Sequence, residues 1–184
     1  MGSLGRVVAP LQQIRAASQM AYSERRIVGY SREQMFDVVA DVEKYREFVP
    51  WCRRSTVHHE GDHSLLADLE VGFQFINASY SSRVTHIRPS VVHSVCSDPN
   101  GGLFRVLDTT WRFSSAPSGE PPLASRIHFD LTFEFRNAAH ARITHLFFDL
   151  VVQKQVAAFL QRAQHIYGEP VRPASAPEVL KYNS

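Results

Sequence analysis

The chain has 184 residues and a formal net charge of +2, and 44% of its residues are hydrophobic. This length predicts one domain large enough to bury a core. The small net charge argues against a nucleic-acid-binding protein, which normally carries a concentrated basic surface. The two cysteines, Cys52 and Cys96, are too few for a disulfide framework and are expected to be reduced thiols.

The N-terminal segment, residues 1–22, contains arginines but no acidic residue, and Val7, Leu11 and Ile14 recur at helical spacing. A basic and amphipathic start is typical of a mitochondrial presequence, and a disordered tail of the same composition is the alternative. No apolar run approaches the ~20 residues that span a bilayer, so no membrane-spanning segment is expected.

The domain is expected to cover residues 23–168. Its first strand is predicted over residues 22–30, because Ile27, Val28 and Tyr30 favour extended structure. Ser31 and Gln34 form a capping-box pattern, which predicts the start of a helix. A second short helix is expected over residues 43–48, since Pro50 disfavours helical structure in the residue before it.

Beyond residue 55 the hydrophobic period changes to two, which predicts antiparallel strands with one apolar face. The expected strands cover residues 65–75, 80–87, 91–96, 103–113 and 127–135. Turns are expected at residues 60–62 and 98–102, and the segment 114–125, rich in Ser, Pro and Gly, is expected to be an exposed loop.

A long terminal helix is predicted over residues 138–167, with Gly168 as its stop. Its apolar stripe recurs every three or four residues and consists of Phe148, Val152, Val156, Phe159, Ala163 and Ile166. Residues 169–184 are expected to form a proline-rich tail. The order of elements predicts an α+β fold, with two short helices after the first strand and a curved antiparallel sheet wrapped around the long helix.

Catalytic and metal-binding motifs are absent from the sequence, which has no phosphate loop, dinucleotide fingerprint, nucleophile elbow or metalloprotease pattern. The group His58, His59, Glu60, Asp62 and His63 straddles a predicted turn and matches no structural zinc spacing, so it is expected to be solvated. We therefore predict no metal and no cofactor, and Cys52 is expected to be a structural thiol.

The stretch Val38–Cys52, which reads VVADVEKYREFVPWC, resembles the mitochondrial coenzyme Q-binding proteins, a branch of the START-like polyketide cyclase superfamily. Residues 69–73 (LEVGF), 111–113 (WRF) and 133–136 (FEFR) agree with the same family. The resemblance extends over residues 22–168.

Three positions depart from the family pattern. Prolines are expected where Gln74 and Phe75 stand, and an acidic residue is expected where Leu150 stands. These departures concern the shape of the tunnel mouth rather than the family itself.

The resemblance implies a helix-grip fold whose hydrophobic tunnel takes ubiquinone or a related polyisoprenoid lipid. It also implies a peripheral protein on the matrix side of the inner mitochondrial membrane. There it would act without catalysis, as a lipid chaperone or carrier for respiratory electron transport and coenzyme Q biosynthesis, with the complexes of those pathways as partners.

Residues of the expected cavity wall lie on the apolar faces and in the motif of the resemblance. They are Phe48, Pro50, Trp51, Leu69, Val71, Phe73, Trp111, Phe113, Phe129, Leu131, Phe133, Phe147, Phe148, Val151 and Val152. Ile143 and Leu150 are expected at the entrance or against the membrane.

Two other functions stay open on the sequence. A cyclase or aromatase working in the same cavity would need a buried acid or base, but Asp68, Glu70, Asp130 and Glu134 occupy the polar phase of their strands. A ribosome-associated interaction protein is the second, because the bacterial ribosome association toxin is similar in the same region.

Overall fold

The computed structural model describes residues 19–74, 76–97, 102–137 and 141–183. Eight strands form one antiparallel sheet in the order β2-β3-β4-β5-β6-β7-β1-β8. The strands are β1 Met20–Val28, β2 Cys52–Gly61, β3 Ser64–Phe73, β4 Ile76–Ile87, β5 Val91–Cys96, β6 Phe104–Ser115, β7 Ser125–Phe135 and β8 Glu178–Asn183. The helices are α1 Arg32–Ala40, the 3-10 helix η1 Val42–Lys44, α2 Tyr45–Phe48 and α3 Ala141–Tyr167.

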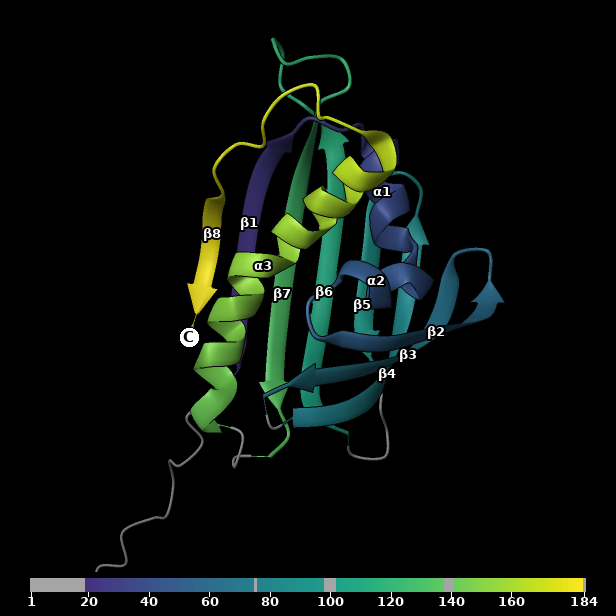
Figure 1. Ribbon diagram of the computed structural model, residues 1–184, viewed down its shortest axis with the longest axis vertical. Coiled ribbons are helices and arrows are strands. Elements are labelled where there is room, and N and C mark those ends of the chain that lie inside the picture. The colour runs from purple at the N-terminus through teal and green to yellow at the C-terminus, as the bar shows by residue number, and fades with distance from the viewer. Residues whose placement is uncertain (1–18, 75, 98–101, 138–140, 184) are drawn as a thin grey trace, which may run out of the picture.

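The sheet is strongly curved, and its concave face is covered by helices (Figure 1). Strands β1, β7 and β6 run side by side behind α3, whereas β2 and β3 turn across the lower right of the molecule (Figure 1). Helices α1 and α2 lie beside α3. The predicted helix-grip plan, with a curved antiparallel sheet around a long C-terminal helix, is confirmed.

Helix α1 begins where the capping box predicts it. The Ser31 hydroxyl accepts a hydrogen bond from the Gln34 backbone N–H, and the Gln34 side chain accepts one from the Ser31 N–H. These two bonds satisfy N–H groups that have no partner inside the helix. The buried face of α1 includes Met35, Phe36 and Val39, and the ring of Phe36 packs against Phe113 on β6.

Strand β2 was not predicted, β4 begins at Ile76 rather than at residue 80, and several other strand ends differ from the sequence prediction. Strand β1 ends at Val28, and Tyr30 instead enters the core and donates a hydrogen bond to the Gly168 carbonyl at 2.9 Å. Strand β3 ends at Phe73 because Gln74 adopts a φ of 47°, a left-handed conformation that interrupts a strand. The expected turn at residues 98–102 lies largely outside the described residues.

Helix α3 ends at Tyr167, and Gly168 follows with a φ of 83°, which is the left-handed cap that the sequence predicts. Four members of the predicted stripe are fully buried, namely Phe148, Val156, Phe159 and Ala163. Ile166 is 48% exposed, so the last turn of the helix does not belong to the core.

The C-terminal segment contributes an eighth strand, which the sequence pattern did not predict. Residues 171 and 175 donate backbone hydrogen bonds to Gly29 and Ile27, and β8 then pairs with β1. The segment crosses so closely that a Cβ atom at Gly29 would lie 2.3 Å from the Arg172 carbonyl oxygen. Gly29 therefore permits the close approach of the two backbones.

Candidate ligand-binding cavity

A partly open cavity of about 130 Å³ lies between the concave face of the sheet and the helices α2 and α3, and we call it the inner cavity. This volume is comparable to the roughly 150 Å³ apolar cavity that binds a benzene molecule in another protein, so it has room for one ring. Its lining is mostly apolar and comes from α2, α3, the segment 49–52 and five strands, β3 to β7. Such an apolar cavity with few polar groups is the usual form of a small-molecule site.

Ten of the fifteen predicted wall residues line the inner cavity. They are Pro50, Trp51, Leu69, Val71, Trp111, Phe129, Leu131, Phe133, Phe147 and Val151. The alternation of β3, β6 and β7 places most of them on one face of the sheet. Their contact with a ligand stays a prediction.

The other five predicted wall residues do not line the inner cavity, and they are Phe48, Phe73, Phe113, Phe148 and Val152. Phe48 packs on Phe159 with ring centroids 5.0 Å apart, and Phe148 packs in the core against Tyr182. Phe113 stacks beside Trp111, and Val152 is half-buried on α3. These side chains support the wall from behind, because each is packed against a neighbouring core residue.

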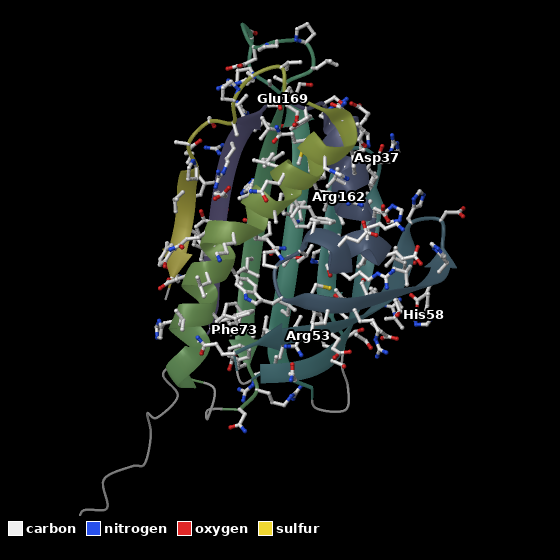
Figure 2. All side chains as sticks on the ribbon, viewed as in Figure 1. Asp37, Arg53, His58, Phe73, Arg162 and Glu169 are labelled. Atoms are coloured by element: carbon white, nitrogen blue, oxygen red, sulfur yellow. The ribbon has the colours of Figure 1, made fainter. Side chains whose placement is uncertain are left out.

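Three aromatic rings form a cluster at the edge of the inner cavity, which we call the aromatic rim. Trp51 and Phe73 have ring centroids 5.4 Å apart, and Phe147 lies within 5.8 Å of both. Phe73 lies at the end of β3, close to the lower half of α3 (Figure 2). Trp51 has a φ of 63°, an uncommon conformation for a bulky residue and one often found at functional sites.

The predicted entrance residues lie on α3. Leu150 is half-buried and does not line the inner cavity, and the side chain of Ile143 lies outside the described residues. Among the described residues, no helix combines the length and apolar character needed to cross a bilayer.

Several lining residues were missed by the sequence reasoning. They are Val42, Tyr45, Val49, Cys52, Tyr80, Val84, Val92, Ser94, Phe104, Leu107, Thr109, Gln155 and Phe159. One signal was available on α3, where Phe147, Val151, Gln155 and Phe159 recur every four residues and therefore share one face. A glutamine in an otherwise apolar series marks a polar contact inside the cavity.

Three polar residues of the lining already have hydrogen-bond partners within the protein. The Tyr45 hydroxyl donates to the Val39 carbonyl at 2.6 Å, and the Ser94 hydroxyl bonds to that of Ser82 at 2.6 Å. The Cys52 thiol donates to the Arg54 carbonyl. These groups need no ligand to satisfy them.

The remaining polar groups of the lining are unpaired. Within the part of the chain that the structure describes, the side chains of Tyr80, Thr109 and Gln155 make no hydrogen bond. Burial raises the pKa of Tyr80 far above its ordinary value, and the nearby thiols of Cys52 and Cys96 add to this effect. Tyr80 therefore remains a protonated phenol at physiological pH.

The acidic residues weighed for a cyclase lie on the convex face of the sheet. Asp68 accepts a hydrogen bond from the Ser81 hydroxyl and is also hydrogen-bonded to His58. His58 lies at the right-hand edge of the molecule (Figure 2). Arg112 pairs with Asp130, and Arg105 pairs with Glu134. Glu70 pairs in the same way with Arg54.

The histidine-rich turn between β2 and β3 is exposed, as the sequence predicts. Glu60 forms an ion pair with Arg83 at 2.5 Å rather than joining the neighbouring histidines. No group of three His, Cys, Asp or Glu side chains among the described residues is placed to hold a metal ion.

We expect the Cys52 thiol to react slowly with iodoacetamide near neutral pH. Burial raises its pKa to about 11, and only the thiolate is a nucleophile. The alkylation rate should rise about tenfold per pH unit and keep rising to about pH 10. Peptide mass spectrometry measures this rate, with Cys52→Ser assigning the site. A plateau near pH 8 would instead identify an ordinary exposed thiol.

The chain matches the family model described as polyketide cyclase / dehydrase and lipid transport over residues 28–160. It is 41% identical, over 90% of its length, to the mitochondrial coenzyme Q-binding protein COQ10 homolog B of Xenopus laevis, and it spans 66% of that relative. It is also 30% identical to the ribosome association toxin RatA of Pseudomonas aeruginosa, over 77% of this chain and 94% of the toxin.

Solved structures share the fold. A START superfamily protein from Mycobacterium smegmatis superposes with a TM-score of 0.65 over 80% of this chain and 99% of that protein. The two are 14% identical, so this likeness concerns the fold alone.

Proposed function

The chain belongs to the coenzyme Q-binding COQ10 branch of the polyketide cyclase / dehydrase and lipid transport family, and from this membership we propose that it binds ubiquinone in the inner cavity. The observation that carries the proposal is the cavity itself, an apolar space between α3 and the sheet with only a few polar side chains in its wall. The fifteen predicted wall residues are its proposed contacts or their immediate support.

The physical chemistry of the ligand favours this site. A polyisoprenoid tail exposes a large apolar area, and its burial stabilises the complex by roughly 25 cal/mol per Å². The volume of about 130 Å³ suits a ring-sized headgroup better than a whole quinone with its tail. We propose that the tail leaves the cavity past the aromatic rim, whose rings offer it further apolar contact.

We propose a binding protein rather than an enzyme. The acidic residues that a cyclase would use, Asp130 and Glu134 among them, pair with arginines on the convex face instead of facing the cavity. Burial raises the pKa of Tyr45 as well as that of Cys52, which keeps both groups protonated and unreactive. This wall is suited to holding a ligand.

The proposed cellular role is that of a lipid chaperone or carrier for respiratory electron transport and coenzyme Q biosynthesis. The relative from Xenopus laevis is a mitochondrial protein by name, and the acid-free residues 1–22 have the composition of a presequence. We propose peripheral contact with the matrix face of the inner membrane near Leu150. In this proposal the ligand-binding domain extends beyond the expected residues 23–168, because β1 begins at Met20 and β8, which ends at Asn183, belongs to the same sheet.

Ribosome association is the second candidate, because the toxin matches over almost its whole length. Several exposed arginines are neutralised by carboxylates, including Arg83 by Glu60 and Arg88 by Asp37. Binding to ribosomal RNA needs free cationic groups, so these ion pairs weigh against it. Cosedimentation of the protein with ribosomes at low salt, with ubiquinone-loaded protein in parallel, would identify this function directly.

We expect the protein expressed in a ubiquinone-producing host to copurify with ubiquinone, because an apolar cavity favours an apolar occupant over water. Organic extraction and mass spectrometry identify and quantify the lipid. Protein from a host that cannot make quinone serves as the control and should take up added ubiquinone saturably. If neither protein binds ubiquinone, the proposed function is wrong.

A further inference from the structure

Of the three unpaired polar residues that the structure describes in the wall of the inner cavity, Thr109 lies on β6 beside the sheet residues, whereas Tyr80 and Gln155 lie on the two opposite sides of the cavity. Tyr80 comes from strand β4 on the sheet side, and Gln155 comes from α3 on the helix side. Neither makes a hydrogen bond within the described part of the chain, whereas Tyr45, Cys52 and Ser94 in the same wall are paired. Both side chains are half-buried, and their polar groups are not among the fully buried unpaired atoms of the described residues, so they are free to form hydrogen bonds with a ligand in the cavity.

On the basis of the proposed function, we propose that Tyr80 and Gln155 orient the quinone ring by donating hydrogen bonds to its two carbonyl oxygens. A 1,4-quinone carries these oxygens at opposite edges of its ring. Donors on opposite walls of the cavity match that arrangement. Apolar neighbours such as Leu131 and Phe133 then contact the faces and substituents of the ring.

The chemistry of the two side chains suits both redox states of the ligand. A phenol hydroxyl and a primary amide can each donate and accept a hydrogen bond. The raised pKa of Tyr80 keeps its proton in place for a carbonyl acceptor. The same pair can accept from the hydroxyl groups of the reduced quinol, whereas a lysine or arginine could only donate. The protein should therefore bind ubiquinone and ubiquinol with similar affinities.

The unpaired groups also discriminate against hydrocarbons. A bound isoprenoid hydrocarbon leaves Tyr80 and Gln155 without partners, and a site built to hydrogen-bond its ligand rejects an analogue that lacks the bonding group. Selectivity for a quinone over a hydrocarbon then comes from Tyr80 and Gln155, while the apolar wall contributes to the affinity for both ligands.

The test compares two probes, a short-tailed ubiquinone and the hydrocarbon squalene, on matched variants. Tyr80→Phe keeps the ring contact with Phe104, and Gln155→Met keeps the length of the side chain. Each variant should bind ubiquinone about fivefold more weakly and squalene no more weakly than the wild type. The controls Tyr30→Phe and Gln153→Met remove the same groups outside the cavity and should leave both affinities unchanged.

Infrared spectroscopy of isotope-labelled ubiquinone adds a readout that packing alone does not change. Loss of a hydrogen bond should move the stretching band of one ring carbonyl to higher wavenumber in Tyr80→Phe but not in Tyr30→Phe. Unchanged ubiquinone affinity and unchanged carbonyl bands in both cavity variants would overturn the assignment while leaving the proposed function intact. An equal loss of squalene affinity would overturn it too. Failure of the wild type to bind ubiquinone would instead refute the proposed function.

Discussion

Val156→Asp is expected to unfold the domain. Val156 is 1% exposed on the inner face of α3, between the fully buried Phe148 and Phe159 along the same helix. An aspartate buried there loses several kcal/mol in desolvation, on top of the packing that the valine contributes. Because small domains have a free energy of unfolding of roughly 5–15 kcal/mol, this loss removes most or all of the stability. Urea denaturation followed by circular dichroism measures it.

The matched control is Leu150→Asp on the same helix. Leu150 is half-buried and lies outside the core, so the carboxylate of an aspartate at this position can reach water. We expect a loss of about 1 kcal/mol or less in stability, together with slower transfer of quinone from liposomes if this edge contacts the membrane. Equal destabilisation by both substitutions would show that Leu150 is core and that the entrance lies elsewhere.

Much of the fold could be predicted because local patterns and tertiary packing agree. The change of hydrophobic period located β3, β6, β7 and α3, and the capping box fixed the start of α1. The alternation of β6 and β7 also placed Trp111, Phe129 and Phe133 on the cavity side. In these elements a residue's phase in the sequence determines which face it occupies.

The wall residues of β4 and β5 could not be found in the same way. The buried face of β4 includes Ser82, and on β5 it includes Ser94, so the apolar alternation is weak there. These two hydroxyls satisfy each other across neighbouring strands, a pairing that becomes visible only once the register is known. Tyr80 was missed for the same reason, since apolar and polar residues do not alternate clearly around it in β4.

Strand β8 was missed because nothing in its own pattern predicts a buried face. All six of its residues are exposed, and it is held by backbone pairing with β1 at the edge of the sheet. The ring of Tyr182 packs against Tyr22 and Phe148, and its hydroxyl bonds to Asp149 on α3. These stabilising contacts join distant segments, which local sequence reasoning cannot detect.

Leu107→Trp is expected to abolish most ubiquinone binding without unfolding the protein. Leu107 lies on β6 and lines the inner cavity, so the larger indole group can extend into the space that the quinone ring would occupy. Filling an existing cavity avoids the strain that an indole causes in a closely packed core. The dissociation constant should rise at least about tenfold, equivalent to about 1.4 kcal/mol, while the melting temperature stays close to that of the wild type.

The neighbouring residue provides the control for this cavity-filling variant. Val106 precedes Leu107 on β6 but does not line the inner cavity, so Val106→Trp places the same indole group outside it. Its ubiquinone affinity should match that of the wild type in an equilibrium titration. Binding of an apolar lipid to the outer surface would be unaffected by Leu107→Trp, because that indole group fills the inner cavity and not the surface. If Leu107→Trp binds ubiquinone with wild-type affinity, the ligand lies outside the inner cavity. If only Leu107→Trp, and not Val106→Trp, loses ubiquinone affinity, the ligand occupies the inner cavity.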